Sequence, residues 1–253
     1  MTATPETTPQ VGGASRGLPD AGPPALGYPA LGTRTGTSTA RDPAFEPLAG
    51  AAGYHGRLGD AVYRIEIPEG WDGGGLVIWS HGFRGMGSEV YVSSPPTPVR
   101  VAILASGYAW AASSYSENGY APGIGADDSL ALKLHFEREF GTAARTIIVG
   151  ASMGGNVVVL ALENFDSVFQ GGLSFCGAIG GEEQLDYLLS WGLLAEYFSG
   201  VHLPIGEPGS MIAALLQVGV LLGTPESLTG AGVRFESAIR ELTGGPRPFF
   251  VEG

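Results

Sequence analysis

The fold is decided by the stretch Thr146-Ile-Ile-Val-Gly150-Ala-Ser152-Met-Gly154-Gly155-Asn-Val-Val-Val-Leu-Ala-Leu162. A short apolar run leads into a serine between glycines, and a longer apolar run follows. This pattern predicts a strand, a tight turn with Ser152 at its apex, and a buried helix. Gly150 and Gly154 carry no side chain, so the backbones of strand and helix can approach closely, and the serine in such a turn adopts strained angles. We therefore predict that Ser152 is lifted clear of the sheet as a nucleophile.

A second copy of the Gly-x-Ser-x-Gly pattern occurs at Gly13-Ala-Ser15-Arg-Gly17. It lies in a tract rich in proline, threonine and glycine, with no apolar strand before it and no helix pattern after it. The pattern therefore lacks the context that gives the serine a chemical role. We interpret Ser15 as part of a linker. For Ser152 the alternative to a nucleophile is an ordinary turn between strand and helix.

Strand and helix patterns alternate on both sides of this turn, which predicts a doubly wound, mostly parallel α/β sheet. Residues 61–67 alternate like a half-exposed antiparallel strand, with Tyr63, Ile65 and Ile67 on one face. Cys176, the only cysteine, ends an apolar run that is typical of a buried strand, so we expect a core thiol. The other predicted elements are strands at 76–79, 108–112 and 172–176 and helices at 98–106 and 129–140.

Two of these motifs together resemble those of the α/β-hydrolase family. Gly150-Ala-Ser152-Met-Gly154 resembles its nucleophile elbow, and Ser80-His81-Gly82-Phe83 resembles its upstream oxyanion motif, in the expected chain order. The resemblance covers residues 60 to 180 and implies acyl transfer by Ser152. It implies that the backbone N–H groups of Met153 and Phe83 receive the developing negative oxygen. It also implies that His81 braces the oxyanion loop and is not the general base.

By composition the chain divides into three parts. Residues 1–50 carry eight prolines, eight glycines and eight threonines, and we predict a disordered arm there. Residues 51–180 form the predicted α/β-hydrolase core. Residues 181–253 read as helices at 184–198, 211–222 and 234–242 with no strand, and resemble the helical cap that many family members insert over the substrate site.

The base and the acid of a catalytic triad are harder to place, because the family supplies them after the serine, the acid first and then a histidine. The only histidine after Ser152 is His202, which lies between presumed cap helices. We retain His202 as the candidate base and Asp186 as the candidate acid. Since the late strands and a strand-positioned histidine are missing, we also expect an N-terminal portion of a longer hydrolase, with little esterase turnover by itself.

The loop 113–123 leaves a predicted parallel strand at its carboxyl end, where open α/β sheets bind ligands. Tyr115 and Tyr120 of this loop, together with His81, are therefore the candidate substrate-binding residues. Ordinary turn residues between a strand and a helix are the alternative interpretation of both tyrosines. His55 and His135 lie in an irregular stretch and in mid-helix, and neither is a candidate for catalysis.

Charge and composition exclude several classes of function. The net charge of -12 and the pI of 4.7 disfavour nucleic acid and anionic membranes as partners. The sequence holds no metal-ligand spacing and no phosphate-binding fingerprint, so we expect no cofactor. It contains no apolar run of membrane-spanning length and no signal-peptide pattern, although tracts like residues 1–50 often follow an export signal. The compartment and the oligomeric state stay open.

The sequence thus predicts a serine hydrolase of carboxylic esters, including aryl or polyester substrates, that forms an acyl-enzyme on Ser152. A peptidase of the same fold is the near alternative, because nothing in the sequence separates amide from ester cleavage. A catalytically incomplete fold that only binds a ligand is the alternative from another class.

Overall fold

The computed structural model describes residues 12–204 and 208–245 and divides into two compact units, Met1–Ile179 and Gly180–Gly253. The outermost residues of the predicted arm, 1–11, and of the predicted cap, 246–253, lie outside the described part. No helix among the described residues is both long and apolar enough to cross a membrane.

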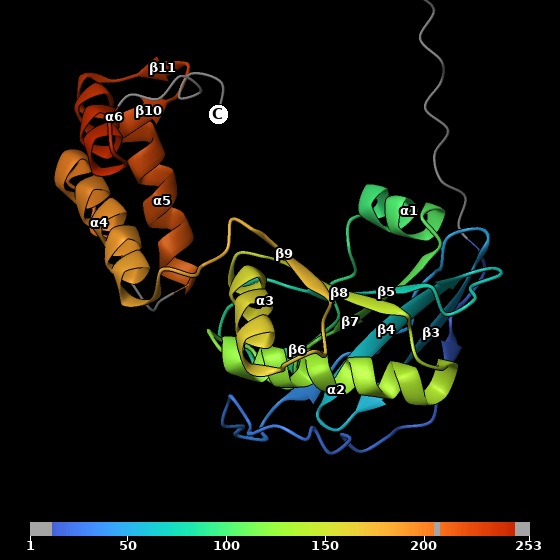
Figure 1. Ribbon diagram of the computed structural model, residues 1–253. Helices are drawn as coiled ribbons and strands as arrows, with labels where there is room; N and C mark the ends of the chain where they lie inside the picture. Colours follow the sequence, from blue (N-terminus) through green and yellow to red (C-terminus); the bar gives the residue numbers. More distant parts are fainter. Residues whose placement is uncertain (1–11, 205–207, 246–253) are drawn as a thin grey trace, which may run out of the picture. The chain divides into compact units, whose positions relative to one another are not determined.

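A mixed, mostly parallel seven-stranded sheet forms the first unit (Figure 1), in the order β1-β3-β4-β7-β5-β8-β9. Strand β4 runs antiparallel to both of its neighbours, whereas the pairs β7–β5, β5–β8 and β8–β9 are parallel. The fold class predicted from the sequence is therefore confirmed. The strands are β1 (Arg16–Gly17), β3 (Ala51–Leu58), β4 (Ala61–Pro68), β5 (Gly75–Ser80), β7 (Tyr108–Ser113), β8 (Arg145–Ala151) and β9 (Gly171–Phe175), and β2 (Thr39–Ala40) pairs separately with β6 (Glu89–Val90).

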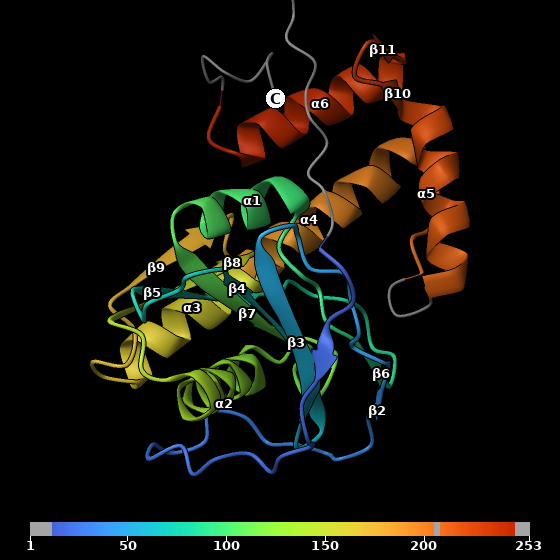
Figure 2. The same ribbon diagram turned by 90° about the vertical axis from the view of Figure 1, so that its right-hand side faces the viewer.

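Helices cover both faces of this sheet, as Figures 1 and 2 show. Helices α2 (Pro122–Phe140) and α3 (Met153–Asn164) lie on one face and α1 (Thr97–Ala105) lies on the other. The larger core cluster joins Ile65, Ile78 and Ile148 of the sheet to residues of α2 and α3. A smaller cluster under α1 contains Val77 and Trp110. The apolar runs of the central strands are thus explained by burial on both faces.

Strand β4 is more buried than its alternating pattern predicted. Val62 and Glu66, expected on a solvent-exposed face, are buried, Glu66 completely. The expectation of a half-exposed strand was wrong because α1 and the chain before β3 cover its second face: Arg100 of α1 and the Leu48 amide both bond the Glu66 carboxylate. Periodicity alone does not reveal that a polar side chain such as Glu66 is buried together with its hydrogen-bond partners.

The chain before the sheet also differs from the expected disordered arm. In the described residues 12–50, apolar side chains such as Leu18, Leu26 and Tyr28 pack against the larger core cluster. Ser15, expected in a linker, hydrogen-bonds the ring of His55, which lies in β3 and not in an irregular stretch. The prediction of disorder from composition was wrong because it considers only the apolar residues of the segment itself. In the structure these residues pack against a core that is formed by residues distant in the sequence.

Strand β9 lies at the edge of the sheet, and its side chains are more exposed than expected. Leu173 and Phe175 are among the exposed large apolar residues, and Cys176 directly after the strand is exposed. The expectation of a core thiol at Cys176 was therefore wrong. An apolar run predicts burial only where both neighbouring strands and a covering helix are present, and among the described residues β9 pairs with β8 alone.

The second unit is helical, with a small core that includes Ala195, Leu203 and Val218. Its helices begin a few residues before the predicted ones, and a short antiparallel hairpin contradicts the expectation that it contains no strand. The elements are α4 (Gly181–Ser199), α5 (Pro208–Leu222), β10 (Gly223–Thr224), β11 (Ser227–Leu228) and α6 (Gly230–Leu242).

The buried carboxylate of Glu66 gives a test of the first unit. Arg100 donates two hydrogen bonds to it, at 2.9 and 2.8 Å, and the Trp110 indole donates a third. Glu66→Ala leaves a largely buried guanidinium unpaired, so we expect a loss of about 3–5 kcal/mol in the free energy of unfolding, measured by urea denaturation. Glu69→Ala, at an exposed position after β4, is the control and changes stability by less than about 0.5 kcal/mol. Equal effects of the two changes would contradict this account.

Candidate active site

Ser152 occupies the turn between β8 and α3 in a strained backbone conformation, with φ 56° and ψ -124°. Left-handed φ values are costly for a residue with a side chain and persist only where the surroundings enforce them. Here the Ser152 amide donates to the Phe175 carbonyl at 3.0 Å, and the Ala178 amide donates to the Ser152 carbonyl at 3.0 Å. The serine is exposed, and its hydroxyl makes no hydrogen bond within the described residues. Its backbone is fixed while its oxygen stays accessible.

Glycines make this turn possible by removing side chains from a three-way backbone crossing. A Cβ atom on Gly150 would overlap the carbonyl of Gly154, and one on Gly154 would overlap the carbonyl of Ser80 at the end of β5. Strand β8, helix α3 and strand β5 therefore meet closely enough to exclude even a methyl group. The close approach predicted from the two glycines is present in the structure.

The segment Gly82-Phe83 lies directly beside the serine. A Cβ atom on Gly82 would sit 3.3 Å from the Ser152 Cβ and 3.8 Å from its hydroxyl oxygen. The Phe83 side chain is 51% exposed, and Met153 is the first residue of α3. Neither the Phe83 amide nor the Met153 amide donates to an acceptor in the part of the chain that the structure describes. Two uncommitted N–H groups thus flank Ser152, one of them at a helix N-terminus, where a negative charge is favoured.

His81 is buried beneath this segment with both ring nitrogens turned to the backbone. Nδ1 lies 2.7 Å from the Gly82 carbonyl oxygen and Nε2 lies 2.9 Å from the Ser114 carbonyl oxygen. Burial, helped by the nearby Arg84 charge, lowers the pKa of His81 to about 4, so at neutral pH the ring has one proton and donates to one of the two carbonyls. Neither nitrogen is available to take a proton from Ser152, and the ring is placed as a brace for the loop.

The structure places the two tyrosines of loop 113–123 differently. Tyr115 is buried, stacks on the His81 ring with 3.9 Å between centroids, and donates to the His81 carbonyl. The Tyr120 side chain is 46% exposed; its hydroxyl donates to the Ala178 carbonyl at 3.3 Å and accepts from Asn156 Nδ2 at 3.1 Å. Tyr115 therefore supports His81 and the segment that follows it from inside the core, whereas Tyr120 borders the elbow at the surface.

Backbone strain concentrates around the serine. Four described residues other than glycine have positive φ values; one is Ser167, and the other three are Tyr115, Ser152 and Cys176, at 56°, 56° and 44°. These three follow the carboxyl ends of β7, β8 and β9, which belong to the parallel part of the sheet. Strained residues of this kind gather at functional sites, and the carboxyl edge of a parallel sheet is where such folds bind ligands. The site is therefore marked by conformation as well as by sequence.

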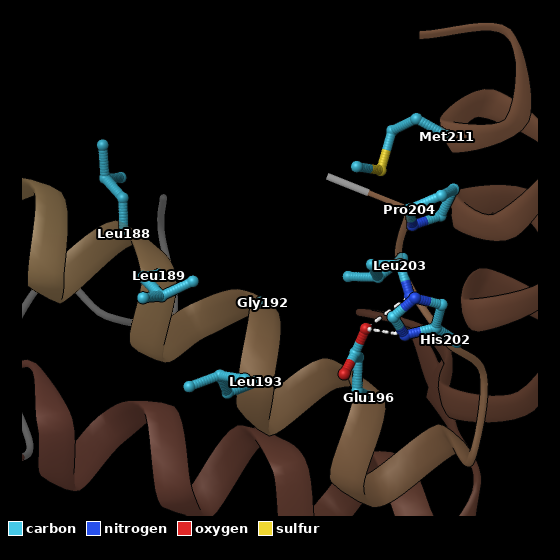
Figure 3. A pocket seen from close by; sticks show the side chains of 9 residues that line it. All are labelled: Leu188, Leu189, Gly192, Leu193, Glu196, His202, Leu203, Pro204 and Met211. Atoms are coloured by element: carbon cyan, nitrogen blue, oxygen red, sulfur yellow. Dashed lines mark hydrogen bonds and ion pairs between the residues drawn. The ribbon is translucent and has the colours of Figure 1, made fainter. Parts of the chain in front are cut away.

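The second unit holds the candidate base. His202 is 85% exposed, and its Nδ1 lies 3.0 Å from the Glu196 carboxylate (Figure 3). Glu196 also accepts the Leu203 amide, so its oxygen is fixed in place. Both residues line a groove of about 530 Å³ whose other walls are mainly leucines. Asp186, the predicted acid, lies exposed on α4 and has no side-chain contact to His202 among the described residues.

Glu196 was not anticipated from the sequence. It lies six positions before His202, across the end of α4 and the Gly200 turn, so no helical or strand periodicity links the two residues. The available signal was chain order, because a serine, an acid and a histidine follow one another at 152, 196 and 202. Among the described residues no group of three histidine, cysteine or acidic side chains could hold a metal ion.

The strand order, the strand directions and the serine turn after β8 are together those of an α/β-hydrolase core. The class of fold that the motifs implied is thereby confirmed. No protein-family model matches the sequence, and no curated protein matches it.

Several solved structures are similar in fold. An acetyl xylan esterase from Aspergillus awamori aligns at 14% identity over 48% of this chain and 48% of its own, with a TM-score of 0.39. The rice cell wall degrading esterase LipA from Xanthomonas oryzae aligns at 18% identity over 64% of this chain and 48% of its own, with a TM-score of 0.36. Oligopeptidase B from Leishmania major aligns at 12% identity over 45% of this chain and 18% of its own, with a TM-score of 0.38. The chain spans about half of the esterases' length and less of the peptidase's.

The backbone crossing at the elbow predicts a steep cost for one added methyl group. Gly154→Ala forces the helix away from β5, and we expect a loss of about 1–3 kcal/mol or more in the free energy of unfolding. Gly171→Ala, in β9, is the matched control because a Cβ there meets nothing within 4 Å. Denaturant titration of both variants measures the difference. A Gly154→Ala protein as stable as Gly171→Ala would show that the crossing does not constrain the fold.

The buried state of His81 predicts a loss of stability in mild acid. The unfolded chain takes up a proton near pH 6.5 but the folded chain does so only near pH 4, so stability is full above pH 6.5 and falls between these values. The loss from this group amounts to about 3 kcal/mol. His135 shifts in the same direction, so the difference in slope between wild type and His81→Asn isolates His81. An NMR titration showing a His81 pKa near 6.5 would refute the prediction.

Proposed function

We propose that this protein is a serine hydrolase that cleaves carboxylic esters through an acyl-enzyme on Ser152. The observation that carries the proposal is the strained, exposed serine at the N-terminus of α3, beside a glycine segment that leaves two backbone amides uncommitted. A protein that only binds a ligand has no need of a strained nucleophile position. The α/β-hydrolase fold is consistent with this chemistry.

In the proposed reaction the Ser152 hydroxyl oxygen attacks the ester carbonyl carbon and its proton passes to a base. The carbonyl oxygen becomes an anion that accepts hydrogen bonds from the Phe83 and Met153 amides, which together with α3 form the oxyanion hole. Collapse expels the alcohol, which takes the proton, and leaves the acyl group on Ser152. Water then attacks the acyl group, releases the acid and restores the serine.

We assign the base of this proposal to His202, held by Glu196. The assignment rests on chain order alone; within the second unit His202 Nδ1 lies 3.0 Å from the Glu196 carboxylate. Glu196 replaces Asp186 as the proposed acid. Esters are preferred to peptides as substrates because an alcohol is a better leaving group than an amine, and aryl esters have the best one.

A fluorophosphonate probe tests the nucleophile without needing the natural substrate. We expect labelling of the wild-type protein at Ser152, detected by mass spectrometry of the modified peptide, and none in Ser152→Ala. Ser15→Ala is a close control, because Ser15 has the same flanking pattern and its hydroxyl lies 2.9 Å from His55 Nδ1, but it lacks the strained turn. Labelling that persists in Ser152→Ala and disappears in Ser15→Ala would refute the assignment.

Hydrolysis of 4-nitrophenyl acetate tests the base. We expect His202→Ala to lower kcat by at least about 100-fold and Glu196→Gln to lower it less, with KM nearly unchanged, since the loss falls on proton transfer. Asp186→Asn, on the same helix as Glu196, is the control and leaves kcat unchanged. Unaltered turnover in His202→Ala would remove His202 from the mechanism while leaving the probe result for Ser152 intact.

A further inference from the structure

The segment 31–36, here called the strap, crosses the start of α2 in the chain that was expected to be disordered. The blue trace of the N-terminal region runs beside α2 in Figures 1 and 2. The approach is close, because a Cβ on Gly32 would overlap Ile124 and one on Gly123 would overlap the Leu31 carbonyl. The strap therefore packs against the helix through backbone as well as through side chains.

Four backbone amides of the strap hold two carboxylates. The Leu31 and Gly32 amides donate to Asp127, at 3.0 and 3.2 Å. The Thr35 and Gly36 amides donate to Glu117. Asp127 is completely buried in the first turns of α2, whereas Glu117 belongs to the loop between β7 and α2. The strap thus ties the loop to the helix that follows it.

The Arg34 side chain makes the central contact. Its Nη2 donates to Asp128 Oδ1 at 2.7 Å and its Nε donates to the Ser116 hydroxyl at 3.0 Å. Asp128 Oδ2 accepts the Ser116 amide at 2.6 Å and the Ser116 hydroxyl at 2.8 Å. Arg34, Asp128 and Ser116 therefore close a ring of hydrogen bonds in which each pair is bonded directly. Burial raises the pKa of Asp128, and the Arg34 charge opposes that shift.

The loop held in this way reaches Ser152. Four residues after Ser116, the Tyr120 hydroxyl contacts Asn156 and the Ala178 carbonyl, and the Ala178 amide fixes the Ser152 carbonyl. The same loop holds the segment that follows Phe83: Asn118 Nδ2 donates to the Gly87 and Glu89 carbonyls, at 2.7 and 2.8 Å. Both borders of the elbow are therefore connected to Ser116 through this one loop.

We propose that the strap is a positioning element for the two loops that border Ser152, acting through Arg34 on the loop 114–121. Arg34 touches no reacting atom. It sets where Tyr120 and the Phe83 segment lie, and so how well the elbow is preorganised. The catalytic consequence rests on the proposed function, whereas the structural consequence does not.

Hydrogen exchange followed by mass spectrometry on the full chain tests the structural part. In Arg34→Met we expect amides of residues 114–121 and 84–90 to exchange at least about tenfold faster, with β8 and α3 unchanged. Arg34→Lys can pair with Asp128 but lacks the fork that also holds Ser116, so it restores protection in part. Arg145→Met, which removes an exposed arginine at the start of β8, is the control and leaves both loops unchanged. Unchanged exchange of 114–121 in Arg34→Met would overturn the inference.

The rate of the fluorophosphonate reaction tests the catalytic part. Arg34→Met should slow the reaction at least about tenfold, while hydrogen exchange of β8 and α3 stays unchanged. Because Arg34 acts through Tyr120, the double variant Arg34→Met/Tyr120→Phe should react little more slowly than the slower single variant. If the two substitutions instead slowed the reaction by multiplicative factors, Arg34 would not act through Tyr120. A wild-type protein that does not react with the probe would refute the proposed function instead, and hydrogen exchange would still decide whether the strap holds the loops.

Discussion

Three backbone segments meet at Gly150, Gly154 and Ser80 with no room for a side chain between them. This crossing joins β8, α3 and β5, the centre of the parallel sheet. It fixes where α3 begins, and hence where the positive end of its dipole lies. Ser152 is the single residue between β8 and α3, and the crossing forces it into a tight, exposed turn. The position of the nucleophile candidate is therefore a consequence of backbone packing, and the serine could be replaced without disturbing what holds it.

The strain at Ser152 is supported by its neighbours and not by the serine itself. Its amide donates to the carbonyl of Phe175 at the end of β9, and its carbonyl accepts the amide of Ala178 after that strand. Tyr115, strained in the same way, is held by its stack on His81. Strain costs on the order of 1–3 kcal/mol at each such position, and a surrounding core must offset it. Preorganisation at this edge of the sheet thus draws on buried contacts well below the surface that a substrate would meet.

The sequence predicted those parts of the fold and the site that depend on neighbours in the chain. The elbow, the central strands and the helix ends follow from glycine spacing and periodicity. What it missed depends on contacts between distant positions: Glu66 is buried because Arg100 and Trp110 reach it, and the strap is ordered because three carboxylates accept its donors. Glu196 and His202 are close in the chain, but their contact was missed because the turn at Gly200 that brings them together has no periodic signal. Periodicity and glycine spacing do not predict such contacts.

The local electrostatic field at the elbow has the opposite sign to the net charge of the chain. The protein carries a formal charge of -12, which disfavours an anion at most of its surface. At Ser152 the N-terminus of α3 instead favours a negative charge, and the Arg84 guanidinium acts together with burial to lower the pKa of His81. Arg84 is held close by its stack on Tyr91, 4.2 Å from the ring centroid. In the proposed reaction the fixed dipole of α3 interacts more strongly with an oxyanion than with a neutral carbonyl, which favours the transition state over the bound ester.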